Sequence, residues 1–505
     1  MKTIETKVPA RMDRLPWSGI HWKVIVGLGT VWILDGLEVT LIGSLAARLV
    51  EPGSGLPITE GQIGLAASIY ILGACLGALF FGRLTDKWGR KKLFVLTLVV
   101  YCIATFATAF AVEPWMFFLC RFFTGAGIGG EYAAINSAVD ELIPASYRGR
   151  VDILINGTYW LGAAFGSFYS LFFLNTAMFS ENMGWRYALI VGGLLGVVII
   201  WVRRHVPESP RWLFIHGREE ESEEIVGEIE ESVEEEKDEP LERVPDDDAI
   251  TIHQRESITL TEIAKTAFGQ YPKRAVLCLA LFVGQAFLYN GITFNLGTLY
   301  SSYYGVDSGR APLLMALFAG VNFLGALILG PLFDRVGRKK MISGTYLGSA
   351  LATVPLYFVF MNQAGGLWGF VALLSLTFFI ATAGASAAYL TVSEIFPMET
   401  RALAIAFFYA IGTGLGGIIG PLMFGQFIES GDRGLVGMGF LIAAGVMAVG
   451  GITEIFLGVD AEGQSLEDIA APITSQDPAG GDDAGAGASD AAATPGGSSA
   501  PDGGG

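Results

Sequence analysis

Two copies of one short motif decide the fold of this chain. The sequence GRLTDKWGRKK at residues 82–92 recurs as GPLFDRVGRKK at residues 330–340, with seven of eleven positions identical. Each copy lies between two long apolar segments, and its glycines permit the tight turn that would join two helices. An internal repeat of this length predicts two homologous halves, each with the same turn at the same place.

Two further pairs repeat at nearly the same offset. ELIP at residues 141–144, followed by Arg148, matches EIFP at residues 394–397, followed by Arg401. More weakly, PES at residues 207–209 matches VDA at residues 459–461. Parallel repeats of this kind indicate a protein that rocks two bundles about a site between them.

The composition places the chain in a membrane. Of its 505 residues, 52% are hydrophobic and only 16% are charged, whereas about 25% charge is usual in soluble proteins. Twelve apolar segments are long enough to span a bilayer: roughly residues 22–50, 61–83, 93–112, 114–143, 148–176, 185–203, 274–304, 310–334, 341–361, 365–395, 400–429 and 435–458. Long continuous apolar runs exclude a β-barrel, and the composition excludes a soluble multidomain enzyme, a fibrous protein and a disulfide-rich scaffold. We expect an all-α membrane protein with twelve transmembrane helices in two homologous six-helix bundles.

Lysine and arginine lie mainly on one side of these segments. Of 32 such residues, 27 lie in the N-terminal segment or the even-numbered connections. Positive charges stay inside the cell, so we expect a multi-pass plasma membrane protein with both termini in the cytoplasm. The expected divisions are an N-terminal segment (1–21), a first bundle (22–203), an acidic cytoplasmic linker (204–273), a second bundle (274–458) and a mostly disordered cytoplasmic tail (459–505).

The net charge of -17 comes from two segments. Residues 219–248 hold 17 acidic and two basic residues, and residues 460–505 hold nine acidic residues and no basic one. Two interpretations are open. Either the acidic face suits the salt-rich cytoplasm of a halophile, where screening removes self-repulsion, or these segments are a solvated disordered loop and tail. We expect no nucleic-acid partner.

The cysteines and histidines show no catalytic or metal-binding pattern. The four cysteines (Cys75, Cys102, Cys120 and Cys278) fall inside apolar segments, and the four histidines (His21, His205, His216 and His253) lie at or beyond the segment ends. No nucleophile with its base, phosphate-binding loop or metal-binding helix pair is evident. We therefore expect no enzymatic activity, no cofactor and no metal site.

The motifs resemble those of the major facilitator superfamily, over residues 20–470. Several features resemble its sugar porter branch: Arg121 with Glu141 twenty residues on, PESPRW at residues 207–212, SEIFP at 393–397 and EGQSLED at 462–468. Others resemble the organic acid/proton symporters: DGLE at residues 35–38 and GGEY at 129–132. The resemblance implies the major facilitator fold, a monomer in the lipid bilayer, and a small-molecule substrate carried together with protons.

Four ionisable side chains inside predicted spans are the candidates for proton coupling: Asp35, Glu38, Arg121 and Glu131. A charge within the membrane is costly, so it marks function by default. Asp35 and Glu38 share one helix face, and two dehydrated carboxylates so close do not both ionise easily, which suits a proton carrier. By resemblance, protonation of Glu38 would release Arg121 and permit rocking, with Glu131 as a second coupling group. The alternative is a static role in holding helices together.

Polar side chains in four spans are the candidate substrate contacts: Asn156, Gln285, Asn290, Asn295, Asn322 and Tyr389. By resemblance, three of them occupy positions where sugar porters contact substrate: Asn156, Asn322 and Tyr389. For each single amide, hydrogen bonding between helices is the alternative.

The chain departs from the sugar porter pattern in span seven. Phe287, Leu288 and Thr293 stand where that pattern has polar amides. An apolar wall beside one polar side favours an aromatic or other organic acid, with Arg121 as a partner for its carboxylate. A sugar or polyol is the alternative.

The repeated motifs supply the candidate residues of a cytoplasmic gate: Gly82, Asp86, Arg90, Glu141, Arg148, Glu208, Arg211, Asp334, Arg338, Glu394 and Arg401. We expect Glu141 with Arg148, and Glu394 with Arg401, to complete ion-pair locks. Breaking and remaking such pairs gives two states of similar energy. Simple anchoring by positive charge is the alternative.

These patterns together predict a secondary active transporter. The expected activity is proton-coupled uptake of a small polar or amphipathic organic solute, an organic acid or a sugar, by alternating access. The alternatives are an uncoupled facilitator, an exporter, and a transporter-like nutrient sensor that signals through its soluble segments.

Overall fold

The computed structural model is almost entirely helical. It describes residues 3–144, 146–203, 208–245, 249–253, 260–397, 401–461, 464 and 469–470. In the first half the helices are α1 (Val8–Asp13), α2 (Gly19–Leu49), η1 (Pro52–Ser54), α3 (Glu60–Trp88), α4 (Arg90–Thr108), α5 (Pro114–Leu142), α6 (Arg148–Phe173) and α7 (Glu181–Arg203). Between the halves lie α8 (Pro210–Ile215), α9 (Glu219–Lys237), α10 (Leu260–Lys265) and the π-helical η3 (Thr266–Gln270). In the second half they are α11 (Pro272–Thr293), α12 (Leu296–Tyr304), α13 (Ala311–Leu329), α14 (Leu332–Arg335), α15 (Arg338–Asn362), α16 (Gly366–Ile395), α17 (Arg401–Phe408), the π-helical η4 (Tyr409–Thr413), α18 (Gly414–Glu429) and α19 (Arg433–Leu457).

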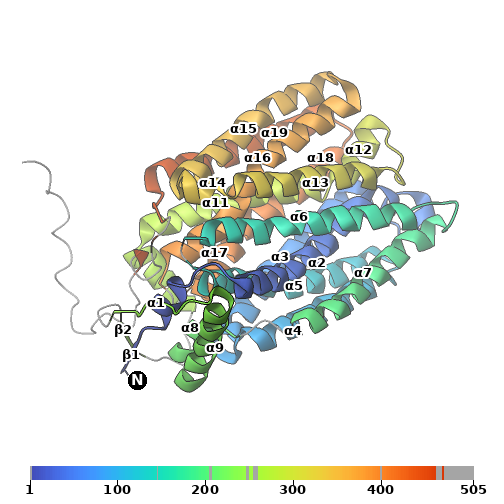
Figure 1. Cartoon of the computed structure of the whole chain (residues 1–505). Coiled ribbons are helices and arrows are strands. Elements are labelled where there is room, and N and C mark those ends of the chain that lie inside the picture. The colour runs from blue at the N-terminus through green and yellow to red at the C-terminus, as the bar shows by residue number, and fades with distance from the viewer. Residues whose placement is uncertain are drawn as a thin grey trace, which may run out of the picture.

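The long helices form two bundles that lie side by side (Figure 1). Helices α2 to α7 make the first bundle, and α11 to α19 make the second. Over the described residues, nine helices are long and apolar enough to cross a membrane, and α5, α6 and α7 run among them. Every expected span corresponds to one of these helices or to two or three consecutive helical segments, so the predicted twelve-helix fold class is confirmed.

Two spans are interrupted. The seventh breaks at Phe294 and Asn295, between α11 and α12, and the eighth breaks at Gly330 and Pro331, between α13 and α14. Proline has no backbone N–H to continue the helical ladder, which explains the second break. The first break was not expected from the sequence, which has no proline there.

Both copies of the repeated motif make the predicted turn. Gly89 has φ 86° and Gly337 has φ 105°, a region of backbone conformation that favours glycine because it has no Cβ. We call the end of the molecule that carries these two turns the motif end. Helices α8 and α9 also lie at this end (Figure 1).

Helices α2 and α6 approach each other very closely. A Cβ placed on Gly36 would lie 1.8 Å from the carbonyl oxygen of Tyr159, and one placed on Gly162 would lie 1.8 Å from that of Ile33. Only glycine fits at either position. Small residues let membrane helices pack backbone to backbone, which accounts for part of the high glycine content.

The acidic segment between the bundles is folded in part. Helix α9 buries Val226, Ile229 and Val233 on one face, and its acidic residues lie on the other. Residues 219–237 are therefore an amphipathic helix and not a disordered loop. The N-terminal strand β1 (Thr3–Thr6) pairs antiparallel with β2 (Ile250–His253) beside it. Residues 471–505 lie outside the described part of the chain.

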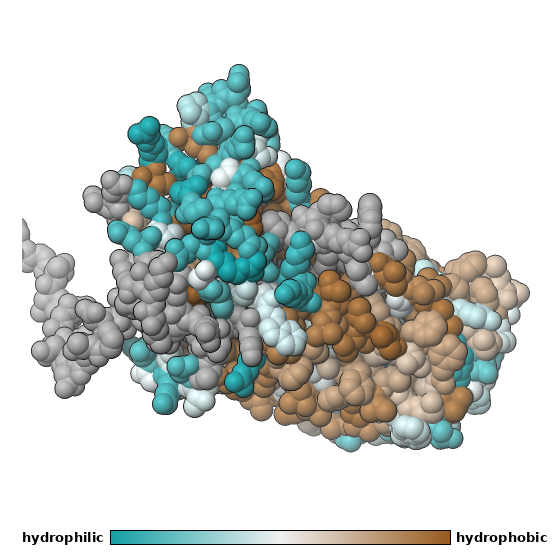
Figure 2. Space-filling model, turned by 90° about the horizontal axis from the view of Figure 1, so that it is seen from below, coloured by the Kyte–Doolittle hydropathy of each residue, from teal (hydrophilic) through white to brown (hydrophobic). Residues whose placement is uncertain are grey.

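Hydropathy divides the surface into two regions. Figure 2 shows a hydrophobic surface over the helical body and a hydrophilic surface gathered at the motif end. Large apolar side chains such as Phe80, Phe165 and Phe456 are exposed on the body. Such a surface is stable only against lipid, so the molecule is a multi-pass membrane protein.

Candidate functional site

A cavity of about 120 Å³ lies between the two bundles. Its lining residues are Trp32, Val39, Ile71, Tyr132, Asn156, Tyr159 and Trp160 from the first bundle, and Gln285, Tyr289, Asn290, Thr293, Phe294, Thr382, Ala385, Ser386, Tyr389, Tyr409 and Thr413 from the second. None of these described lining residues carries a charge. Ligand sites of this kind are concave, mostly apolar, and hold a few polar groups that orient the ligand.

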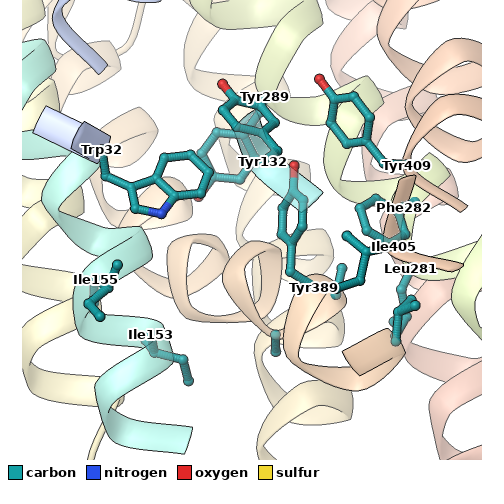
Figure 3. Packing of buried hydrophobic residues seen from close by; sticks show 14 of the residues in the cluster. Trp32, Tyr132, Ile153, Ile155, Leu281, Phe282, Tyr289, Tyr389, Ile405 and Tyr409 are labelled. Carbon is teal, nitrogen blue, oxygen red and sulfur yellow. The ribbon is translucent and has the colours of Figure 1, made fainter. Parts of the chain in front are cut away.

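Aromatic rings make most of the cavity wall. The indole of Trp32 stacks on Tyr132 with ring centroids 4.7 Å apart and planes inclined by 24°. Tyr132 also meets the edges of Tyr389 and Tyr409. Figure 3 shows the rings of Trp32, Tyr132, Tyr289, Tyr389 and Tyr409 gathered around one region. Such rings offer flat faces for stacking and hydroxyl groups for hydrogen bonds.

The π-helical segment η4 brings two residues to this wall. Tyr409 begins η4 and Thr413 ends it, and both line the cavity. Single π turns inside α-helices occur often at functional sites because they shift the register of the side chains that follow. No feature of the sequence predicts this π-helical segment.

Four of the six candidate substrate contacts line the cavity: Asn156, Gln285, Asn290 and Tyr389. Asn290 Nδ2 donates to the carbonyl of Ala286 at 3.0 Å, which leaves its amide oxygen available. The Gln285 amide makes no hydrogen bond to any described residue, so both of its polar atoms are available to a ligand.

The other two asparagines lie away from the cavity lining. Asn295 Nδ2 donates to the carbonyls of Gly291 and Pro421 at 3.0 and 3.1 Å. Asn322 Nδ2 donates to the carbonyl of Phe318 at 2.9 Å. Both side chains are fully buried, and the bonds of Asn295 join two helices at the break between α11 and α12.

The two large apolar residues of span seven that were expected to form a wall of the site do not line the cavity. Neither Phe287 nor Leu288 is among the described lining residues. Phe287 instead packs against α18, where a Cβ on Gly416 would lie 2.9 Å from its backbone nitrogen. Thr293 does line the cavity. The apolar character of the site therefore comes from aromatic residues on other helices.

The four coupling candidates lie together beside the cavity, and all four are buried. The carboxylates of Asp35, Glu38 and Glu131 all interact electrostatically with Tyr101 of α4. Glu131 also accepts a hydrogen bond from the Thr97 hydroxyl at 3.0 Å. These three carboxylates therefore lie near one tyrosine side chain of α4.

Arg121 lies buried over an aromatic ring. Its guanidinium carbon is 4.7 Å from the ring centroid of Tyr70, and its two terminal nitrogens have no hydrogen-bond partner within the described residues. Glu38 attracts it electrostatically without forming a direct ion pair. Neither carboxylate oxygen of Glu38 has a hydrogen-bond partner in this part of the chain.

A short series of contacts connects Arg121 to the cavity. The Tyr70 ring, which lies against Arg121, is next to the Tyr132 side chain. Tyr132 in turn stacks on Trp32 in the cavity wall. A ligand that moves Tyr132 would therefore displace the ring on which the buried guanidinium rests.

The second copy of the gating motif forms a buried ion-pair network. Arg338 donates to both carboxylate oxygens of Glu394 at 3.0 and 3.1 Å and to Asp334 at 2.7 Å. Asp334 also accepts a hydrogen bond from the backbone nitrogen of Arg150 in the first bundle at 2.9 Å. The partner of Glu394 is thus Arg338; the side chain of Arg401, the expected partner, lies outside the described residues.

In the first copy, an unexpected residue pairs with the motif arginines. Asp13 of α1 accepts hydrogen bonds from Arg148 and from Arg211, each at 3.2 Å. Glu208 accepts one from the backbone nitrogen of Lys91 at 3.2 Å, at the start of α4. Gly82 faces Ala406 of the second bundle. The side chains of three other motif residues lie outside the described part: Asp86, Arg90 and Glu141.

The two bundles contact each other at both ends of their interface. At the motif end, Asp334 bonds the start of α6. At the opposite end, α12 lies against α2, where a Cβ on Gly297 would be 2.5 Å from the carbonyl oxygen of Gly43. Helix α18 also lies against α3, since a Cβ on Gly425 would be 2.9 Å from the Cα of Gly64. The two bundles therefore contact each other on both sides of the cavity.

Sequence reasoning missed most of the cavity wall: Trp32, Tyr132, Tyr159, Trp160, Tyr289 and Tyr409. One signal was available. Tyr159 and Trp160 follow Asn156 by three and four residues, which places them on the same helix face. The others lie on four different helices and come together only through packing. Asp13 was missed because it belongs to the N-terminal segment, outside the repeat.

Comparisons with known proteins agree with this geometry. Residues 39–472 match the family described as sugar (and other) transporter. The chain is 28% identical over 468 residues to the niacin transporter NiaP of Acinetobacter baylyi, covering 91% of this chain and 99% of that protein. It is 26% identical over 398 residues to the major myo-inositol transporter IolT of Bacillus subtilis, covering 74% and 78%.

Solved structures match the fold. The proton:xylose symporter XylE bound to 6-bromo-6-deoxy-D-glucose superposes with a TM-score of 0.69 at 19% identity, covering 89% of this chain and 98% of that one. The inward open conformation of XylE from E. coli gives a TM-score of 0.63 at 19% identity, covering 89% and 98%. With two six-helix bundles, repeated gating turns and a central cavity, the chain belongs to the sugar (and other) transporter family of the major facilitator superfamily and is a membrane transporter.

Proposed function

We propose that this transporter carries out proton-coupled uptake of a small, flat aromatic solute that bears an amide or carboxyl group. The observation that carries the proposal is the cavity wall. It combines stacked aromatic rings with the neutral amides of Asn156, Gln285 and Asn290 and has no charged residue among those described. A planar ring would stack between the aromatic side chains, and the amides would orient its polar group.

The relatives support an aromatic solute. NiaP of Acinetobacter baylyi is a niacin transporter, and a protein of Bacillus subtilis that is 26% identical over 407 residues is a putative niacin/nicotinamide transporter. Niacin is a pyridine ring with one carboxyl group. The dimensions and chemistry of the cavity suit a solute of this class.

Arg121 is not the direct carboxylate partner in this proposal. It lies behind Tyr70 and Tyr132, outside the cavity lining. The hydroxyl groups of the tyrosines and the amide of Gln285 are the donors available to a carboxyl or amide group. Arg121 instead acts in coupling.

Proton coupling is assigned to Glu38 and Arg121, with Asp35 and Glu131 beside them. A buried carboxylate is costly to ionise unless a positive charge compensates it. Glu38 therefore keeps its charge only while Arg121 lies near it. Protonation of Glu38 would weaken its hold on Arg121. The contacts through Tyr70 and Tyr132 then link that event to occupation of the cavity.

Alternating access follows from breaking the two closed contacts in turn. The gate at the motif end contains Asp334, Arg338 and Glu394, and the contact at the opposite end contains the α12–α2 packing. We place the motif end, both termini and α9 in the cytoplasm, because most lysine and arginine residues lie there, and we propose a monomer in the plasma membrane. Import then begins with opening at the end opposite to the motif end.

A sugar or polyol is the second candidate. It is favoured by the amides in the cavity and by the relation to IolT, a myo-inositol transporter. A polyol would hydrogen-bond the amides and lay its apolar face on Trp32. It would not use the stacked arrangement of several rings, and this is why we prefer an aromatic solute.

The test is uptake into proteoliposomes at high salt, with and without an inward proton gradient. The solutes are nicotinate, nicotinamide, benzoate, myo-inositol, xylose and an aliphatic acid. We expect gradient-dependent accumulation of an aromatic solute. Accumulation of a polyol alone would overturn the aromatic assignment, equilibration without gradient dependence would indicate a facilitator, and binding without flux would indicate a sensor.

A further inference from the structure

A second cavity lies on the outside of the first bundle at the motif end. It has a volume of about 1100 Å³ and is lined by Leu76, Leu79, Phe80, Arg83, Leu84, Trp88, Lys92, Trp212, His216, Arg218 and Leu260. We call it the α3–α8 groove. Its lining combines apolar side chains with basic ones, and it shares no lining residue with the transport cavity.

The side chains along α3 change character in order. Leu76, Phe80 and Arg83 stand on one face of the helix because they are spaced by four and three residues. Leu76 and Phe80 are 49% and 61% exposed, and the step from Leu76 to Arg83 covers about 10 Å along the axis. Trp88 follows at the end of α3 and is exposed. Apolar side chains, then a cation and a tryptophan, match the order of acyl chain, headgroup and interface in a lipid leaflet.

Two basic groups of the groove lack a partner among the described residues. Arg83 and Lys92 are both exposed, and neither forms an ion pair or a hydrogen bond with any described residue. No acidic side chain is among the described lining residues. Unpaired cations beside an apolar, membrane-facing surface attract anionic lipid headgroups.

The opposite wall of the groove carries a stacked pair of rings. His216 stacks on Trp212 with ring centroids 4.4 Å apart, and its Nδ1 lies 2.9 Å from the Trp212 carbonyl. Its Nε2 is buried without a hydrogen-bond partner in the described part of the chain. Arg218 lies at the same rim but is paired with Glu221.

We propose that the α3–α8 groove binds one phospholipid with an anionic headgroup. The phosphate lies between Arg83 and Lys92, and an acyl chain runs along Leu76, Leu79 and Phe80. The bound lipid would tie the α3–α4 turn to α8, which follows the first bundle. That turn is part of the gating motif. By holding the turn to α8, the lipid would stabilise the packing of α8 against the first bundle.

The internal repeat supplies a matched comparison. Lys340 occupies the position of Lys92 in the second copy, and Pro331 occupies that of Arg83. The second copy therefore lacks the arginine that begins the headgroup site. Arg335 and Lys340 are exposed at that turn and lie outside the α3–α8 groove, so their replacement changes the charge equally without touching the site.

The experiment is native mass spectrometry of the full chain released from detergent micelles containing phosphatidylglycerol or phosphatidylcholine. We compare the unaltered protein with the double variant Arg83→Gln, Lys92→Gln and with the control Arg335→Gln, Lys340→Gln. Phosphatidylglycerol should bind the unaltered protein and the control alike, and should bind the Arg83/Lys92 variant roughly tenfold more weakly. Phosphatidylcholine should bind all three weakly and equally.

Three outcomes would overturn the proposal. One is equal retention of phosphatidylglycerol by the groove variant and the unaltered protein. Another is an equal loss in the control, which would indicate attraction by net charge alone. The last is displacement of the lipid by millimolar inorganic phosphate, which would indicate a site for a soluble anion. Lipid binding is read without transport, so these outcomes are independent of the proposed substrate.

Discussion

Asp334 of the second bundle accepts a hydrogen bond from the backbone nitrogen of Arg150 in the first bundle at 2.9 Å, and this bond joins the two halves at the motif end. The carboxylate lies at the N-terminus of α6, where the helix dipole favours negative charge. It is held there by Arg338, which donates to it at 2.7 Å. Opening at this end must break the bond to Arg150.

Replacing Asp334 by Asn should favour the state that is open at the motif end. The neutral amide keeps the size of the side chain but loses its attraction for the helix N-terminus and for Arg338. We expect longer distances between spin labels across the motif end, together with slower transport and retained substrate binding. Asp432→Asn, at the start of α19 on the opposite end, is the control. Unchanged distances in Asp334→Asn would show that this bond does not hold the gate.

Replacing Glu394 by Gln should destabilise the second bundle. Arg338 and Glu394 are both about 2% exposed, and breaking a buried pair from one side costs about 3–5 kcal/mol because the other charge is left without its partner. Thermal unfolding in detergent measures the effect, with the exposed Glu429→Gln as control. The double variant Arg338→Met, Glu394→Leu should recover much of the loss. A single variant as stable as the unaltered protein would contradict this account.

Replacing Glu38 by Gln should abolish uptake driven by a proton gradient and spare exchange of substrate by counterflow. The amide cannot carry the proton, but it allows Arg121 the same freedom as the protonated acid. Asn322→Ala, a buried change away from the cavity lining, is the control for misfolding. If both activities fell together in Glu38→Gln, the role of this residue would be structural.

Replacing Trp32 by Ala should weaken binding of an aromatic solute about tenfold, because an aromatic pair contributes about 0.5–1.5 kcal/mol beyond its buried area. Binding is measured by the change in tryptophan fluorescence or by calorimetry on the purified protein. Phe287→Ala, a change in a buried ring outside the cavity lining, should leave the affinity unchanged. Equal losses in the two variants would indicate a general effect on folding.

The docking of α1 on α9 should depend on pH. Burial works against ionisation of Glu230, but hydrogen bonds from Arg11 and Arg14 prevail and lower its pKa from 4.5. A lowered pKa in the folded state stabilises the docked form above pH 4.5, and this contribution is lost as the pH falls through the lowered value. The protection of the α1 amides, which is their exchange rate compared with that of an unstructured peptide at the same pH, should therefore fall as the pH drops below 4.5.

The control for that series is Glu230→Gln, whose α1 amides should be less protected than those of the unaltered protein at neutral pH and should lose less protection on acidification. Glu235→Gln, on the exposed face of α9, should behave like the unaltered protein. High salt should also loosen α1 because it screens the ion pairs. Exchange in α1 that is independent of both pH and salt would assign the docking to apolar packing instead.

The sequence predicted the features that depend on residues close together along the chain, and it did not predict most contacts between distant residues. The spans followed from runs of apolar residues, and the turns at Gly89 and Gly337 followed from a local motif. Asp35, Glu38, Arg121 and Glu131 were found because a charge in an apolar run is visible without neighbours. Of their grouping, the resemblance implied only that Glu38 lies with Arg121.

The partners of the gate residues were harder to predict. Glu394 pairs with Arg338, 56 residues away, and Arg148 pairs with Asp13, 135 residues away. Many acidic residues could pair with each arginine, and the sequence does not indicate which of them lies beside it in the folded protein. Helix α9 was also not predicted from the sequence, because its few apolar residues are separated by many glutamates.

The sequence by itself determined the membrane location, the twelve spans, the two homologous halves and the positions of the buried charges. These depend on composition, periodicity and repetition, which are properties of the chain before it folds. The tertiary structure alone decided the aromatic cavity, the bond between Asp334 and Arg150, and the groove between α3 and α8. Each of these joins side chains from separate helices, and their distances are set by helix packing that no local pattern encodes.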